Sequence, residues 1–213
     1  MNNKYFNFGL GVGICVFLST LLVYIVMAAT SESNQTQNQQ QAGEITQPVN
    51  TAKKAKAIFF NPLGEEKGMA ILEESANGVL ILLSLDDMPI GEHAIHIHET
   101  GNCTPIETTG APTPSDYFTN AGSHLNPDKH EHGIMNENGP HAGDLLNIHV
   151  NDNGTLQTHL FSSNITLHSD NDAAFLLDDD GSAIIIHEGA DDYQTPPTGN
   201  AGDRIACAVI ESE

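Results

Sequence analysis

The sequence predicts an all-β fold, an antiparallel sandwich or barrel with two long loops. From Thr51 onward, short runs rich in Val, Ile, Leu and Phe alternate with turn-prone Gly, Asn and Asp residues. No long stretch shows the apolar period of about 3.6 residues that an amphipathic helix needs. Such spacing favours an antiparallel sandwich or barrel. The eight predicted strands cover residues 55–60, 68–72, 79–85, 92–98, 145–150, 156–161, 183–187 and 205–210.

Turn residues separate these strands. Residues 76–78 (Ala-Asn-Gly) separate the second strand from the third, and residues 152–154 (Asp-Asn-Gly) are a hairpin signal between the fifth and the sixth. Residues 163–180 fit either a loop or a turn of helix. Two longer segments, 99–143 and 188–203, are predicted as loops. Because loops of this length in a compact domain are usually functional, we expect the binding or catalytic residues in these two loops.

Two segments precede the first strand. Residues 1–29 contain one charge, Lys4, followed by an apolar run of about 20 residues, which is long enough to span a bilayer. This segment is either a removable signal peptide or an uncleaved membrane anchor, and both export the rest of the chain. Residues 30–52 are rich in Ser, Asn, Gln and Thr and predict a flexible polar tether. Residues 53–213 then form the folded domain.

Charge and cysteine content narrow the class of protein. The formal net charge is −21, which argues against binding to nucleic acid or to an anionic membrane surface. Cys15 lies in the apolar segment, so Cys103 and Cys207 remain as an even pair. In an exported protein such a pair forms a disulfide more often than two free thiols.

Histidines suggest metal binding. His96 and His98 lie two residues apart in a predicted strand, so they point to the same face and can bind one ion together. His93 points to the opposite face, and we expect it to form structural hydrogen bonds. Further candidate ligands are His124, His132, His141, Asp144 and His187. Two spacing patterns predict two metal sites; imidazole suits copper and zinc, and a set of three histidines and one carboxylate suits tetrahedral zinc.

The combined motifs resemble those of the copper/zinc superoxide dismutases, particularly the exported bacterial branch. The resemblance covers about residues 53–213, with the segments in the family's order. The matching segments are Gly91-Glu-His-Ala-Ile-His-Ile-His-Glu, Ala121-Gly-Ser-His-Leu-Asn-Pro, His141-Ala-Gly-Asp-Leu, Ile186-His-Glu-Gly-Ala-Asp-Asp-Tyr and Gly199-Asn-Ala-Gly-Asp-Arg-Ile-Ala-Cys. The resemblance implies an eight-stranded Greek-key β-barrel, which is a sandwich-type architecture.

The resemblance also implies roles for single residues. The implied ligands are His96, His98, His124 and His187 for copper, and His124, His132, His141 and Asp144 for zinc. His124 would therefore bridge the two metals. Asp191 would hydrogen-bond one histidine of each metal, and a disulfide would join Cys103 to Cys207. His130 is a rival to His132, which the family spacing favours.

The implied activity is conversion of superoxide to dioxygen and hydrogen peroxide by copper redox cycling, with a structural zinc. Arg204 would hold the incoming anion and His124 would supply a proton. The implied location is the periplasm, either free or anchored to the inner membrane, and both a monomer and a homodimer remain open. Because residues 188–203 contain four acidic side chains and no lysine, we expect weak steering of the anion, with Lys129 as a substitute.

Two other functions compete with the enzymatic one. One is a non-enzymatic metal-binding or copper-delivery module, and the other is a structural or adhesive β-domain that uses only zinc. The first should lack some copper ligands or the arginine, and none of them is missing here. Retention of His96, His98, His187 and Arg204 also argues against the second.

Overall fold

The computed structural model describes residues 53–104 and 113–213. The segments predicted as leader (1–29) and tether (30–52) lie outside these residues. The elements are β1 (Lys54–Phe60), β2 (Glu66–Ser75), β3 (Gly78–Leu85), β4 (Gly91–His93), β5 (Ile95–His98), the 3-10 turns η1 (Pro114–Asp116) and η2 (Thr119–Ala121), β6 (Ile148–Val150), β7 (Leu156–Ser162), β8 (Ile165–Thr166), β9 (Ala174–Phe175), β10 (Ala183–His187) and β11 (Arg204–Ser212). Across the described residues, no helix is long and apolar enough to span a membrane.

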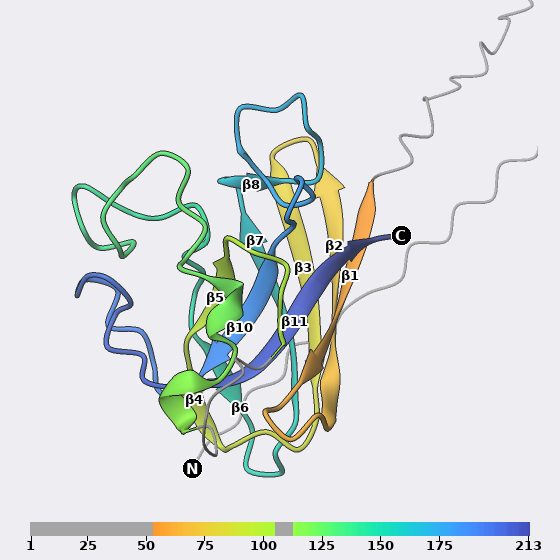
Figure 1. The fold of residues 1–213 in the computed structure, drawn as a ribbon, viewed down its shortest axis with the longest axis vertical. Helices are drawn as coiled ribbons and strands as arrows, with labels where there is room; N and C mark the ends of the chain where they lie inside the picture. The colour runs from red at the N-terminus through yellow and green to blue at the C-terminus, as the bar shows by residue number, and fades with distance from the viewer. Residues whose placement is uncertain (1–52, 105–112) are drawn as a thin grey trace, which may run out of the picture. The chain divides into compact units, whose positions relative to one another are not determined.

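Seven strands form one curled sheet in the order β5-β10-β11-β1-β2-β3-β7, and every neighbouring pair is antiparallel (Figure 1). The order is not sequential, because the last strand, β11, pairs with the first, β1. A separate antiparallel ladder joins β4 to β6. Since β4 leads into β5 and β6 precedes β7, this ladder links the two edges of the curled sheet at one end. The predicted all-β antiparallel fold is confirmed.

The segment predicted as one strand over residues 92–98 forms two strands, so that prediction was wrong. Ala94 separates β4 from β5 because its N–H donates to the carbonyl of Gly189 (2.8 Å) and its carbonyl accepts from the N–H of His187 (2.9 Å). As a result, β4 pairs with β6, whereas β5 pairs with β10. The interruption depends on a segment far along the chain, which local sequence patterns do not reveal.

Three further segments differ in detail from the prediction. The strand expected from residue 145 begins only at Ile148, because the N–H of Asn147 donates to the hydroxyl oxygen of Tyr193 (2.8 Å) instead of a ladder. The turn at residues 152–154 forms, but the strands on its two sides pair with β4 and β3 instead of each other. Residues 163–180 contain two short parallel strands, β8 and β9, and no turn of helix.

The core follows the two-residue period of the strands. In β3, Val79, Ile81, Leu83 and Leu85 are buried, and the residues between them are half-buried. One face of each strand therefore points inward. The inward faces of β1, β2, β3, β5, β10 and β11 meet in one continuous apolar cluster, which includes the fully buried Leu72.

Strand β10 is buried on both of its faces. Ile184 packs in the main core, whereas Ile185 belongs to a second cluster with Phe118 and Cys207. The predicted disulfide between Cys103 and Cys207 is present at this second cluster. It fastens the start of the long loop to β11, so the loop covers the outer face of the sheet.

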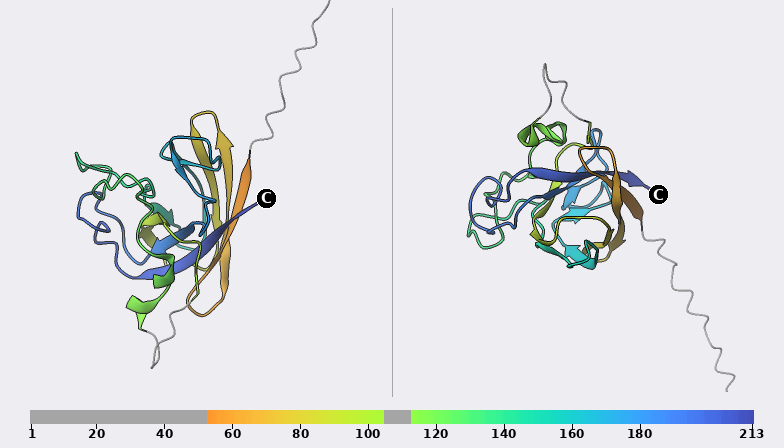
Figure 2. Two further views of the ribbon diagram at one scale, coloured as in Figure 1. Left: turned by 45° about the horizontal axis from the view of Figure 1, so that its top comes forward. Right: turned by 90° about the horizontal axis from the view of Figure 1, so that it is seen from below.

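The described part of the first predicted long loop that carries the ligands, 122–143, lies beside the second loop, 188–203, on one side of the sheet (Figures 1 and 2). No strand of the described residues falls within them. The N–H of Met135 in the first loop donates to the carbonyl of Tyr193 in the second (3.1 Å). The loops are thus joined to each other as well as to the sheet.

Truncating the core should destabilise the domain. Leu72→Ala removes a fully buried side chain, and we expect it to lower the free energy of unfolding by about 3 kcal/mol. Leu63→Ala is the control, because Leu63 is 80% exposed and should change stability by less than about 0.5 kcal/mol. Urea unfolding of the metal-free protein measures both. Equal stabilities of the two variants would contradict the core assignment.

Candidate metal centre

The two faces of β5 have different surroundings. Its two isoleucines face the main core. His96 and His98 therefore point to the opposite face, where the long loops leave them almost fully buried. His187 ends the neighbouring strand β10, and an isolated bridge places His124 of the long loop opposite His98. Strand geometry and one loop contact thus bring four histidines together.

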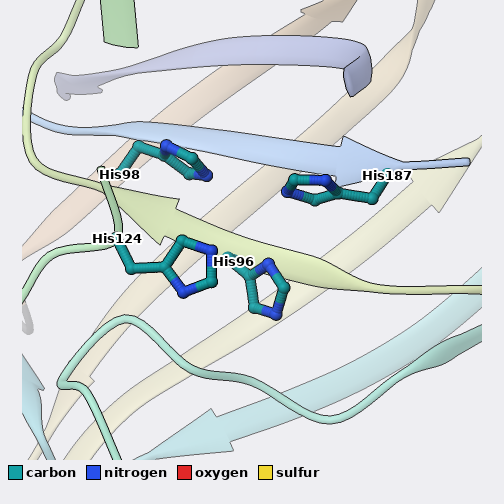
Figure 3. A group of neighbouring side chains, drawn as sticks. All are labelled: His96, His98, His124 and His187. Atoms are coloured by element: carbon teal, nitrogen blue, oxygen red, sulfur yellow. The ribbon is translucent and has the colours of Figure 1, made fainter. Parts of the chain in front are cut away.

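These four side chains, which we call the first set, are His96, His98, His124 and His187. Their rings converge on one point, as Figure 3 shows, and their nearest nitrogens lie within 4.8 Å of one another. The converging nitrogens are His96 Nδ1, His98 Nε2, His124 Nε2 and His187 Nε2, and none has a hydrogen-bond partner among the described residues. A buried nitrogen without a partner costs free energy, and a cation shared by all four would satisfy them together.

The far nitrogens of the first set fix the orientation of the rings. His98 Nδ1–H donates to the carbonyl of Gly122 (3.0 Å), and His187 Nδ1–H donates to the carbonyl of Gly202 (3.1 Å). A neutral imidazole that donates through one nitrogen carries a lone pair on the other. The carbonyls therefore leave the Nε2 lone pairs of both rings available to a metal.

Burial also favours the neutral form of these rings. Desolvation lowers the pKa of His124 to about 4 and that of His187 to about 3. It also holds the pKa of His98 well below its usual value, and the neighbouring His124 adds to the effect. Three members of the first set are therefore neutral at pH 7, as metal ligands must be.

A second set surrounds one carboxylate oxygen and consists of His124, His132, His141 and Asp144. The oxygen Oδ1 of Asp144 lies 2.9 Å, 3.1 Å and 3.3 Å from the Nδ1 atoms of His124, His132 and His141. The Nδ1 atoms of His124 and His141 are 3.4 Å apart. Tetrahedral ligands about 2.0–2.1 Å from zinc would lie roughly 3.3 Å apart, so this spacing fits zinc.

The second oxygen of Asp144 fixes the orientation of the carboxylate. Its Oδ2 accepts the N–H of Gly133 (2.9 Å) and the N–H of His141 (3.0 Å). Burial would raise the pKa of Asp144, but the hydrogen bonds from the three histidines and Gly133 outweigh it and hold that pKa far below its usual range. The carboxylate is therefore charged, which a divalent cation requires.

His124 belongs to both sets through different atoms. Its Nε2 is one of the four unpartnered nitrogens, whereas its Nδ1 faces Asp144. One imidazole can therefore contact two cations, one at each nitrogen. Two nearby cations stabilise an imidazole that has lost both protons, which an isolated histidine does not do at neutral pH.

Asp191 hydrogen-bonds one histidine of each set. Its Oδ2 accepts from His96 Nε2 (2.8 Å) and its Oδ1 from His132 Nε2 (3.0 Å). Both rings therefore keep Nδ1 for a metal, so this group supports the two sets instead of forming a third site. Burial disfavours a charge on His132, but Asp144 and Asp191 outweigh it and raise the pKa of His132 to about 9.

Arg204 lies beside the first set. Its guanidinium donates to the carbonyls of Phe118 (2.7 Å) and Gly122 (2.7 Å), and His98 Nδ1–H donates to the same Gly122 carbonyl. One backbone oxygen thus joins the arginine to a ring of the first set. Burial lowers the pKa of Arg204 below its usual range. It remains charged at neutral pH and can attract an anion.

The remaining histidines lie outside both sets. His130 is exposed, with Nδ1 3.1 Å from the carbonyl of Pro140, whereas its rival His132 is fully buried. His93 places its two ring nitrogens at the carbonyls of His187 (2.9 Å) and Pro89 (2.8 Å), which is the expected structural hydrogen bonding. The others, all exposed, are His149, His159 and His168.

Comparison with known proteins identifies the family. Residues 66–210 match the family model described as copper/zinc superoxide dismutase. The Cu-Zn superoxide dismutase 1 of Aquifex aeolicus is 40% identical over 159 residues, which cover 74% of this chain and 88% of that protein. The Cu-Zn superoxide dismutase of Caulobacter vibrioides is 36% identical over 158 residues, which cover 74% and 85%. The chain belongs to the copper/zinc superoxide dismutase family.

Solved structures agree with this assignment. The Cu/Zn superoxide dismutase from Brucella abortus matches with a TM-score of 0.60 and 25% identity, covering 74% of this chain and 99% of that one. A double mutant of a superoxide dismutase-like protein from Bacillus subtilis matches with a TM-score of 0.65 and 37% identity, covering 72% and 95%. The predicted Greek-key barrel and the predicted family are confirmed. The family's cofactors, copper and zinc, fit the donor atoms of the first and second sets.

Two residues near the sets were missed in the sequence. Asn147 and Tyr193 both contact Asp191, through hydrogen bonds of 2.6–2.9 Å. Asn147 stands in no matching segment, and Tyr193 ends the matching segment 186–193 without a role that the resemblance assigns. Their role depends on contacts between segments 44 residues apart, which no local pattern encodes.

Zinc binding to the metal-free protein should release protons. With a pKa of about 9, His132 is protonated at pH 7.5, and a zinc ligand must be neutral. We therefore expect apparent zinc affinity to rise up to about tenfold per pH unit until pH 9 and to level off above it. Chelator competition from pH 6 to 10 measures this. A binding enthalpy independent of buffer ionisation at pH 7.5 would contradict proton release.

Proposed function

We propose that this chain is an exported enzyme that converts two superoxide anions and two protons to dioxygen and hydrogen peroxide at a centre of two metals. The first set would bind copper and the second set zinc, with His124 shared. One observation carries the proposal: four buried imidazole nitrogens face one another without a protein partner. The ligand types support the assignment, because an all-imidazole set suits copper and a set that contains a carboxylate suits zinc.

When bound, copper supplies one-electron redox chemistry, and zinc, which does not change oxidation state, supplies a fixed charge. The protein's own part is to attract the anion and to move protons. Arg204 offsets the negative charge of superoxide beside His98, because both groups share the carbonyl of Gly122. With its Nδ1 on zinc, His124 would carry a proton at Nε2 whenever that nitrogen is free of copper, and it would pass this proton to the reduced oxygen species.

A zinc-only domain is the rival function. A superoxide dismutase-like protein of Bacillus subtilis is 32% identical to this chain. In the solved double mutant of a superoxide dismutase-like protein from that organism, a tyrosine and a proline are replaced with histidine. In the present chain all four positions of the first set are histidine. The presence of Arg204 beside that set further favours the redox enzyme.

We also propose the organisation of the whole chain. Residues 1–29 would export the protein, as a cleaved signal peptide or as an anchor in the inner membrane, and residues 30–52 would tether the domain 53–213. The disulfide between Cys103 and Cys207 supports export, because such bonds persist mainly in oxidising compartments such as the periplasm. The enzyme would then protect the cell envelope from superoxide.

Metal reloading tests the enzyme directly. The full chain is stripped of metal, then loaded with zinc alone or with copper and zinc, and superoxide removal is measured. We expect activity only after loading with both metals. His187→Gln should lower that activity at least about 100-fold while leaving zinc binding intact, because His187 belongs to the first set alone. Tight zinc binding without activity under either loading would leave the zinc-only domain.

Salt dependence tests the weak steering. Because the chain is strongly acidic, added salt should screen repulsion, and we expect kcat/KM to rise about twofold between 0.01 and 0.15 M salt. Glu188→Lys places a positive charge in the loop after β10 and should raise the rate at low salt. Glu211→Lys, the same charge change at an exposed position near the end of β11, is the control. Rates that fall with salt in the unmodified protein would show that attraction dominates.

A further inference from the structure

Asn147 clamps the backbone of Asp191. Its side-chain Nδ2–H donates to the carbonyl of Asp191 (2.9 Å), and its Oδ1 accepts the N–H of Asp191 (2.9 Å). The amide group thus pairs with both backbone groups of one residue, much as a neighbouring strand would. Two simultaneous bonds fix the position and also the rotation of that residue.

Tyr193 holds the same site from the other side. Its N–H donates to Asp191 Oδ1 (2.6 Å), and its hydroxyl oxygen accepts the N–H of Asn147 (2.8 Å). Its carbonyl accepts the N–H of Met135, which lies in the loop that carries His132. Tyr193 adopts a left-handed backbone conformation, φ 63°, to make these contacts. One residue therefore joins three segments around Asp191.

The space behind Asp191 is closed as well. Gly199 also has a left-handed backbone, φ 65°, and a Cβ there would collide with Asp191 Oδ1 and crowd His132 Nε2, 2.7 Å away. The Asp191 side chain is 1% exposed, and its carboxylate cannot turn towards solvent without moving the loop. Its two oxygens are left facing His96 and His132.

We propose that Asn147 and Tyr193 are positioning residues for both metal sites. They set the place of Asp191, and Asp191 in turn sets the ring orientation of one histidine from each set. This inference rests on the proposed function only in taking the two sets as metal ligands. It predicts that a change at Asn147, which touches no ligand, weakens metal binding through Asp191 alone.

The test is a double-mutant cycle in zinc affinity, measured on the full chain by competition with a chelator. Asn147→Ala should weaken zinc binding about 10–100-fold, the range found for lost outer partners of metal ligands. Tyr193→Phe removes one hydroxyl acceptor and should weaken it about fivefold. In an Asp191→Ala background, each change should cost less than about twofold, because the carboxylate it positions is gone.

A matched control separates positioning from folding. Asn151→Ala removes a similar bond, from Nδ2 to the carbonyl of Thr155 (2.9 Å), in the turn between β6 and β7 and away from both sets. It should change urea stability slightly and zinc affinity not at all. In the copper-loaded protein, the electron paramagnetic resonance spectrum should change in Asn147→Ala and stay constant in Asn151→Ala, because Asp191 also holds His96.

Two results would overturn the inference. One is a loss of zinc affinity in Asn147→Ala that persists undiminished in the Asp191→Ala background. The other is unchanged zinc affinity and an unchanged copper spectrum in both Asn147→Ala and Tyr193→Phe. The readouts are independent of catalysis, so an inactive reloaded enzyme would remove the proposed function and leave this inference standing if the cycle shows coupling.

Discussion

The unpartnered imidazole nitrogens of the first set are the constraint on which the rest of the structure depends. An unsatisfied buried polar group costs about 1–3 kcal/mol, and four of them converge here. The remaining ring nitrogens of His98 and His187 donate to backbone carbonyls, so these rings cannot turn away to satisfy themselves. The barrel and its loops must hold this arrangement together before any ion arrives. A bound cation turns the cost into a gain, which links metal binding to the stability of the fold.

The two buried carboxylates supply negative charge beside the uncharged imidazoles. Asp144 and Asp191 are each surrounded by histidine nitrogens, and these hydrogen bonds keep both pKa values well below the usual range. Their charges attract cations into a site that burial would otherwise disfavour. The same sign of charge, repeated over an acidic chain, repels an anionic substrate. Arg204, held by two backbone carbonyls beside the first set, is a local positive charge, and under the proposed function it would offset this repulsion.

The sequence predicted those parts that depend on local pattern. The two-residue period located the strands of the sheet, and the same period placed His96 and His98 together on one face of β5. It did not predict the break at Ala94 or the late start of β6, because both arise from hydrogen bonds to the loop after β10. The contacts of Asn147 and Tyr193 with Asp191 were not predicted for the same reason. The sequence predicted the side chains that could bind metal. It did not predict the hydrogen bonds between distant segments of the chain that orient those side chains.

The two sets differ in what builds them. Three members of the first set come from adjacent strands β5 and β10, so their spacing follows from sheet geometry. The second set comes from the long loop and from Asp144, which directly follows it. There the bond from Gly133 to Asp144 and the bond from Met135 to Tyr193 take the place of strand pairing. The strands hold the first set in place without a metal. In the second set, three histidine nitrogens surround Asp144 Oδ1, and a cation would have to replace these hydrogen bonds. Because His124 belongs to both, occupation of the loop site fixes the direction of Nε2 towards the strand site. Under the proposed assignment, zinc in the loop site would act on the redox chemistry through the geometry of His124, without taking part in electron transfer.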